Sequence, residues 1–163
     1  MGLTTGSDCD ITRKLNKDLM LMGLEGEGLV DNRVWVIKSH YPERYGNSEF
    51  FCDRAILLVR NPLDCIISLF HMVCTGSHNY SVHDDDFKTF ASLWEEFVGQ
   101  EDTVWDEFHK FWLRSKVPTY IVRYEDILER AEHTLKGLVE FILNVDDISG
   151  TKVHKYLKLA VNE

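Results

Sequence analysis

The chain has 163 residues, a formal net charge of −9 at pH 7, and 44% hydrophobic residues, of which many are aromatic. This length suits one domain with a substantial core. This negative net charge argues against general nucleic-acid binding, which needs a basic surface. No run approaches the ~20 apolar residues of a membrane helix, and the N-terminus lacks a signal-peptide pattern. The four cysteines show no C-x-x-C spacing, so the sequence does not predict a zinc site.

The first part of the chain predicts a helix over Ile11–Met22, which the glycine-rich segment Gly23–Gly28 ends. A glycine-rich turn can bind phosphate through its backbone N–H groups. This segment, however, precedes the next strand instead of following one, and Glu25 and Glu27 would repel an anion. We therefore interpret it as a connector.

Residues 34–37 form the first clear strand pattern, and Lys38-Ser39-His40 follows at its end. In an open α/β sheet, ligands bind beyond the carboxyl ends of the strands. Histidine is the side chain best suited to act as a base near neutral pH, and a lysine can stabilise developing negative charge. The same three residues also fit an ordinary surface loop, so the pattern alone leaves both readings open.

A second strand is predicted over Ala55–Val59, an unbroken apolar run typical of a strand buried on both faces. Arg60 follows it directly, and then Asn61 and Pro62 are suited to the cap and the first position of a helix. An arginine between the end of a strand and the start of a helix can form a phosphate site, because the helix dipole and free N–H groups favour an anion.

The helix that follows has an apolar face, formed by Leu63, Ile66, Ile67 and Phe70. Its polar residues fall on another stripe, formed by Asp64, Ser68 and His71. The alternative to an anion site is that Arg60 pairs with an acidic neighbour and Ser68 is a plain surface residue.

The rest of the chain predicts further helices and one more strand. Residues 83–86 (His-Asp-Asp-Asp) indicate a solvated turn, since three consecutive carboxylates cannot all face one ion from a regular element. Aromatic stripes predict two helices that Gly99 separates, and residues 120–123 predict a third strand. The remaining expected helices lie within residues 135–142 and 153–159.

Two motifs in register resemble the sulfotransferases that use 3′-phosphoadenosine 5′-phosphosulfate (PAPS). Arg60-Asn61-Pro62-x-Asp64-x-x-x-Ser68 is similar to the family's 3′-phosphate-binding segment, which implies that Arg60 and Ser68 hold that phosphate. Lys38-Ser39-His40 resembles the family's Lys-Thr-His segment, with serine in place of threonine. The resemblance implies that His40 is the catalytic base and that Lys38 stabilises the sulfuryl group.

A third match is Tyr124-Glu125-Asp126, which resembles a Tyr-Glu-Asp segment of the family. It implies that Tyr124 lies near the adenine of the nucleotide, while Glu125 and Asp126 are expected to hold the loop and cap the next helix. Trp105, His109 and Trp112 resemble a family helix, but we assign His109 no chemistry. The resemblance covers roughly residues 34–143.

Two family segments have no counterpart in the sequence. These are the Pro-Lys-Ser-Gly-Thr-Thr loop for the 5′-phosphosulfate and the later Arg-Lys-Gly segment. Residues 1–163 are therefore expected to form a single, partial sulfotransferase-like domain that is incomplete at the N-terminus. Thr5-Gly6-Ser7 and the glycine-rich segment hint at the carbohydrate-type branch with WSC-domain members.

These observations lead to one set of expectations. The fold is expected to be α/β, with a three-layer arrangement around a central parallel sheet of at least three strands. The implied reaction moves a sulfuryl group from PAPS to a hydroxyl or amine of a small-molecule or glycan acceptor, without a metal. The alternatives are an inactive nucleotide-binding or interaction protein of the same fold and a kinase that needs magnesium and ATP. The compartment stays open between the Golgi lumen, for the carbohydrate branch, and the cytoplasm; the oligomeric state is also open.

Overall fold

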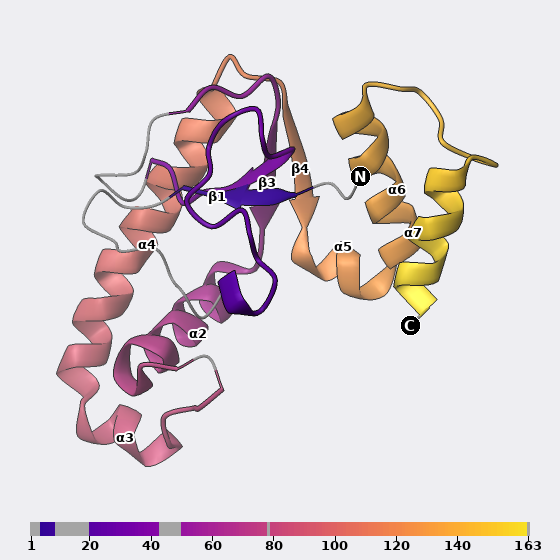
Figure 1. Ribbon diagram of the computed structural model, residues 1–163. Helices are drawn as coiled ribbons and strands as arrows, with labels where there is room; N and C mark the ends of the chain where they lie inside the picture. The colour runs from indigo at the N-terminus through magenta and orange to yellow at the C-terminus, as the bar shows by residue number, and fades with distance from the viewer. Residues whose placement is uncertain (1–3, 9–19, 43–49, 78, 163) are drawn as a thin grey trace. The chain divides into compact units, whose positions relative to one another are not determined.

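The computed structural model describes residues 4–8, 20–42, 50–77 and 79–162 (Figure 1). The chain divides into two compact units, Met1–Cys52 (unit 1) and Asp53–Glu163 (unit 2), and each is described here by itself. Most of the helix predicted over Ile11–Met22 lies outside the described residues, although Met20 and Leu21 are helical.

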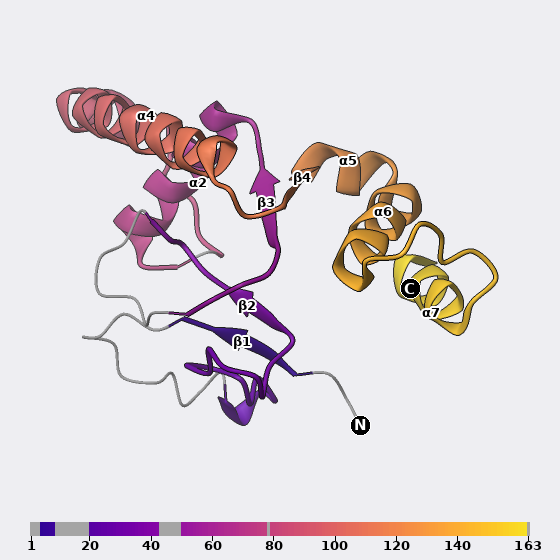
Figure 2. The same cartoon turned by 90° about the horizontal axis from the view of Figure 1, so that it is seen from above.

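Unit 1 contains a pair of short parallel strands, β1 (Thr5–Ser7) and β2 (Val36–Lys38), which lie side by side in Figure 2. Thr5 pairs with Val36, and Ser7 pairs with Lys38. The sequence analysis did not predict β1, because Thr-Gly-Ser carries no apolar run or alternation. The first described strand is therefore β1, and not the strand expected over residues 34–37.

The glycine-rich segment packs directly against β1. A Cβ atom on Gly26 would lie only 1.9 Å from the carbonyl oxygen of Thr5, so only glycine allows this approach. Ser7 donates its backbone N–H to the Gly26 carbonyl (3.3 Å), and its hydroxyl donates to Glu27 Oε2 (2.5 Å). The segment is a connector, as predicted, but it follows β1 and covers that strand, so the expectation that it follows no strand was wrong.

Unit 2 is built on the parallel strands β3 (Ala55–Val59) and β4 (Thr119–Arg123). Leu57 pairs with Ile121 and Leu58 with Val122, so Leu57 and Val122 lie on opposite faces, and both are buried. Leu58 is 56% exposed, so the prediction that the whole apolar run is buried on both faces was wrong.

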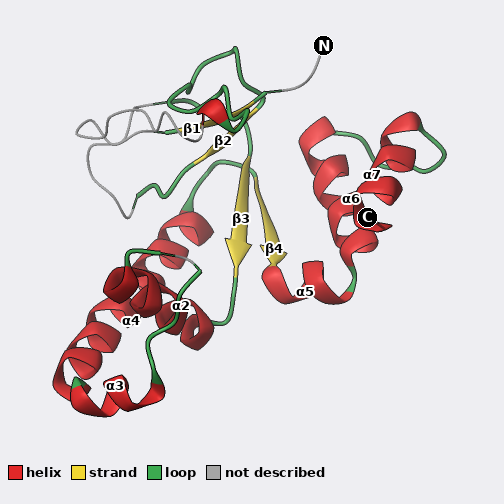
Figure 3. Ribbon diagram, turned by 60° about the horizontal axis from the view of Figure 1, so that its bottom comes forward, coloured by secondary structure: helices red, strands yellow, loops and turns green. Residues whose placement is uncertain are grey.

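Helices lie on two sides of the β3–β4 pair in unit 2 (Figure 3). On one side α2 and α4 pack together, with α3 beside them, and Phe70 of α2 contacts the rings of Phe87, Trp94 and Phe97. On the other side α6 packs on α5, α7 and β4. The helices are α2 (Pro62–Thr75), α3 (Asp84–Thr89), α4 (Ala91–Arg114), α5 (Tyr124–Glu129), α6 (Ala131–Leu143) and α7 (Lys152–Asn162).

Two predicted boundaries differ from the structure. The aromatic stripes on either side of Gly99 belong to one continuous helix, α4, because a glycine weakens a helix without ending it. Residues 84–86 begin α3 instead of forming a turn. The Asp86 carboxylate there accepts the backbone N–H of His83 (3.3 Å), and negative charge stabilises the N-terminus of a helix.

Replacement of Gly99 by alanine is expected to raise the free energy of unfolding by about 0.5–1 kcal/mol, because alanine loses less conformational entropy in a helix interior. Apart from the neighbouring backbone of α4 itself, an added Cβ would meet no atom within 4 Å. Urea unfolding followed by circular dichroism measures the change. Gly26→Ala serves as the opposite case and should destabilise unit 1, since its Cβ would collide with the Thr5 backbone. A destabilised Gly99→Ala variant would contradict the continuous helix.

The observed fold is α/β, as predicted, with parallel strands and flanking helices. The described strands form the parallel pair β1–β2 within unit 1 and the parallel pair β3–β4 within unit 2. Among the described residues, no helix combines the length and the apolar character needed to cross a membrane.

Candidate functional site

The carboxyl ends of β3 and β4 are joined by a backbone-to-carboxylate hydrogen bond. Asn61 donates its N–H to Glu125 Oε1 at 2.9 Å, and the Asn61 side chain accepts the N–H of Leu63 at 3.0 Å to cap α2. The N–H of Asn61 is the main reason why the pKa of Glu125 lies below its ordinary value, with smaller contributions from Arg123 and Arg60. The predicted cap and the predicted loop-holding role of Glu125 are confirmed.

Arg60 stands at the end of β3 and stacks on the aromatic ring of Tyr124. Its guanidinium carbon lies 4.9 Å from the ring centroid. Tyr124 follows the neighbouring strand β4, so the parallel pairing of the two strands brings these side chains together. Stacking on an aromatic ring leaves the N–H groups at the edge of the guanidinium able to bind an anion.

The start of α2 has fewer free backbone N–H groups for binding an anion than the sequence predicts. Pro62 has no N–H, the N–H of Leu63 is taken by the Asn61 side chain, and the N–H of Asn61 is taken by Glu125. An anion near Arg60 must therefore depend mainly on side chains.

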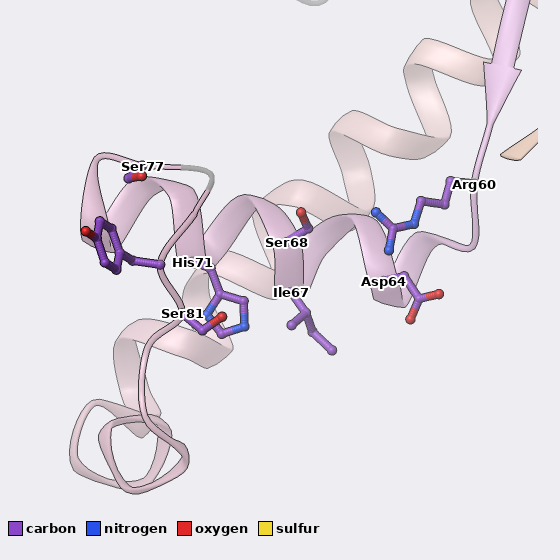
Figure 4. Close-up of a pocket in the computed structure, with 8 residues that line it drawn as sticks. Arg60, Asp64, Ile67, Ser68, His71, Ser77 and Ser81 are labelled. Carbon is purple, nitrogen blue, oxygen red and sulfur yellow. The ribbon is translucent and has the colours of Figure 1, made fainter. Parts of the chain in front are cut away.

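A pocket of about 270 Å³ opens along the polar stripe of α2 (Figure 4). Arg60 reaches it from the end of β3, Ser68 and His71 project from α2, and Ser77 and Ser81 come from the loop after the helix. Pockets for whole ligands typically span ~300–1,000 Å³, so this one suits a single polar group of a larger ligand. The lining residues are Arg60, Asp64, Ile67, Ser68, His71, Ser77, Tyr80 and Ser81.

The loop after α2 is tied back to the helix at several points. Gly76 takes a left-handed conformation (φ 67°) and donates its N–H to Met72 O at 2.8 Å. Ser77 donates its N–H to the Thr75 hydroxyl at 3.2 Å. Val82 donates its N–H to His71 Nδ1 at 3.0 Å. These contacts hold the loop beside the pocket.

Lys38 and His40 lie in unit 1, at the end of β2, where their side chains contact each other. Lys38 Nζ is 2.5 Å from His40 Nε2, and an ammonium has only donors, so the ring accepts through Nε2. Between them, Ser39 donates its hydroxyl to Asp8 Oδ2 at 2.6 Å and accepts the N–H of Tyr41 at 2.9 Å. The segment is thus held by hydrogen bonds around Ser39, and His40 carries its lone pair next to a cation.

The structure groups the five predicted site residues into two sets. Arg60 and Ser68 line one pocket, and Tyr124 packs on Arg60, all within unit 2. Lys38 and His40 contact each other within unit 1. Sequence analysis did not assign His71 or the loop residues 77–81 to the site. The i, i+4, i+7 spacing of the polar stripe was the signal for His71, whereas the loop carried no periodic signal.

Two further predictions concern groups outside this site. His109 is packed in α4, with Nδ1 2.6 Å from the Trp105 carbonyl oxygen and its ring 3.9 Å from the Trp105 ring. Within the described ranges, no group of three or more His, Cys, Asp or Glu side chains is placed to hold a metal ion.

Comparison with known proteins identifies the family. The family model described as "Sulfotransferase domain" matches residues 28–159, which is most of the chain. The chain belongs to the sulfotransferase domain family. The match covers the Lys38 segment, both strands of unit 2 and the whole pocket.

Several curated relatives of this sulfotransferase domain are WSCD family members from insects. The chain is 28% identical to one from Drosophila pseudoobscura pseudoobscura and 26% identical to one from Drosophila melanogaster, over 81% of this chain and 42% of each relative. A relative from Aedes aegypti is 26% identical over the same shares. The chain therefore spans about two fifths of the length of these relatives. No solved structure gives a significant match.

Proposed function

We propose that this sulfotransferase domain transfers a sulfuryl group from PAPS to a hydroxyl or amine of a small-molecule or glycan acceptor. The observation that carries the proposal is the position of Arg60, which stacks on Tyr124 and faces the same pocket as Ser68. A cation, a hydroxyl and an aromatic ring suit a phosphate attached to a nucleoside. Membership in the sulfotransferase domain family supports sulfate transfer over other uses of such a site.

In this proposal, Arg60 and Ser68 hold the 3′-phosphate of the nucleotide. The guanidinium gives two parallel N–H donors to one phosphate, and the Ser68 hydroxyl gives a third. Tyr124 lies on the other side of the guanidinium and contacts the adenine end. The pocket volume of about 270 Å³ suits a phosphate and part of its ribose.

His40 is the proposed base. Its Nε2 lone pair takes the proton of the acceptor hydroxyl as the acceptor oxygen attacks sulfur, and the bond between sulfur and the bridging phosphate oxygen breaks. Lys38 must leave its contact with Nε2 at this step, which frees the ammonium to stabilise the charge on the transferred group. Such in-line transfers depend mainly on positioning and charge stabilisation.

Calorimetry with two nucleotides tests the proposal. Adenosine 3′,5′-bisphosphate should bind at least about tenfold more tightly than adenosine 5′-monophosphate, since the 3′-phosphate adds a charge-assisted contact of roughly 1.5–3 kcal/mol. Equal affinities, or no binding of either, would overturn the nucleotide site. Tight binding without any sulfate transfer from PAPS would instead support the non-catalytic alternative. A magnesium-dependent preference for ATP would support the kinase alternative.

A further inference from the structure

The tautomer of His71 follows from its contact with the loop after α2. Val82 donates its backbone N–H to His71 Nδ1 at 3.0 Å, so Nδ1 carries a lone pair and the proton of the neutral ring is on Nε2. The ring is half-buried, and its side packs edge-on against Phe87 with centroids 5.7 Å apart. His71 therefore has one orientation and one remaining donor, Nε2–H.

His71 lies one helical turn from Ser68, which is one of the proposed phosphate contacts. Ser68 and His71 are three residues apart on α2, so their Cβ atoms are about 5–6 Å apart. Both residues line the pocket that Arg60 enters from the end of β3 (Figure 4). One phosphate group is wide enough to accept hydrogen bonds from both side chains.

The charges around the pocket favour a further hydrogen-bond donor for a bound anion. Asp64 also lines the pocket, and its carboxylate opposes an anion. The N–H groups of Asn61 and Leu63 are already used, so the start of α2 does not compensate for this carboxylate. Among the described residues that line the pocket, Arg60 is the one arginine or lysine.

From these observations we infer that His71 is a phosphate-binding residue: its Nε2–H donates to the same phosphate that Arg60 and Ser68 hold. The inference rests on the proposed function, because it assumes that this pocket binds a nucleotide 3′-phosphate. His71 is then the third side chain that contacts the phosphate. The loop that contains Val82 fixes the tautomer of His71 through the Val82 N–H.

Two substitutions distinguish the acceptor role of His71 Nδ1 from the donor role of His71 Nε2. The amide of asparagine reaches only as far as Nδ1, so His71→Asn keeps an acceptor for Val82 N–H and removes the donor at Nε2. Glutamine reaches as far as Nε2, so His71→Gln keeps a donor toward the pocket and removes the acceptor at Nδ1. Calorimetry with adenosine 3′,5′-bisphosphate and adenosine 5′-monophosphate is then carried out on wild type, both variants and Arg60→Ala.

His71→Asn should weaken binding of the bisphosphate about tenfold, as expected for loss of a hydrogen bond to a charged group. It should leave binding of the monophosphate unchanged, and His71→Gln should retain most of the bisphosphate affinity. If His71→Asn binds the bisphosphate as tightly as wild type, or His71→Gln alone loses affinity, then His71 only anchors the loop and the inference is wrong.

A measurement on the wild-type protein makes the test independent of variant folding. The ¹⁵N signal of His71 Nε2, assigned by its loss in His71→Asn, should shift when the bisphosphate is added and not when the monophosphate is added. An unmoved signal at saturating bisphosphate would overturn the inference. If the proposed function itself is wrong, the wild-type protein will bind the bisphosphate no more tightly than the monophosphate.

Discussion

Replacement of Arg60 by alanine is expected to weaken binding of adenosine 3′,5′-bisphosphate roughly ten- to a hundredfold, the effect of losing a charge-assisted contact worth about 1.5–3 kcal/mol. Alanine removes the permanent cation that stacks on Tyr124 and faces Ser68. Asp64 would then act on the bound phosphate without an opposing charge from Arg60. Isothermal titration calorimetry at fixed ionic strength measures the change, because salt screens such contacts.

Two variants serve as controls for Arg60→Ala. Arg60→Lys keeps the positive charge but loses the paired donors and the flat stacking surface, so its affinity should fall between wild type and alanine. Arg114→Ala removes an exposed arginine at the end of α4, which is not among the pocket-lining residues. If Arg60→Ala binds the nucleotide no more weakly than Arg114→Ala does, Arg60 is not part of the site.

Replacement of His40 by alanine is expected to slow sulfate transfer from PAPS by about 10²–10⁴-fold, the usual contribution of a positioned general base. Affinity for adenosine 3′,5′-bisphosphate should stay unchanged, because the proposed nucleotide-binding side chains are Arg60, Ser68 and Tyr124 and do not include His40. The natural full-length protein is the material for this assay, with transfer from radiolabelled PAPS and affinity measured on the same preparations.

His83→Ala is the matched control for the His40 variant. His83 is an exposed histidine, and it precedes α3 outside the pocket lining. Surface substitutions usually change stability by less than ~0.5 kcal/mol. The rate of sulfate transfer by His83→Ala should therefore stay within about twofold of the wild-type rate. Transfer that survives in His40→Ala would show that another group is the base. An equal drop in both variants would show that the loss is not specific to His40.

The start of α2 could be predicted from the sequence because its signals are local. Asn61 caps the helix, Pro62 occupies its first position, and Ile66 and Phe70 are buried as the apolar spacing indicates. The contact between Arg60 and Tyr124 needed more than local signals. It depends on the pairing of β3 with β4, which the resemblance to sulfotransferases implied but which no short stretch of sequence specifies.

The features that sequence analysis missed depend on contacts between distant segments. β1 is a strand because Thr5–Ser7 pairs with β2 and is covered by Gly26, not because of its own residues. The exposure of Leu58 likewise depends on what packs over β3, and an apolar run gives no information about its coverage. The loop that supplies Ser77, Tyr80 and Ser81 to the pocket is held by hydrogen bonds to α2, which leave no periodic pattern in the sequence.

The hydrogen bond from Asn61 to Glu125 has a consequence for the energetics of ligand capture. It immobilises the peptide that follows Arg60, while the Tyr124 ring restricts the arginine side chain itself. Much of the entropy that a flexible arginine would lose upon association is therefore already lost during folding. The guanidinium meets an incoming anion preorganised, so a single cation can bind effectively in a protein whose overall charge is negative.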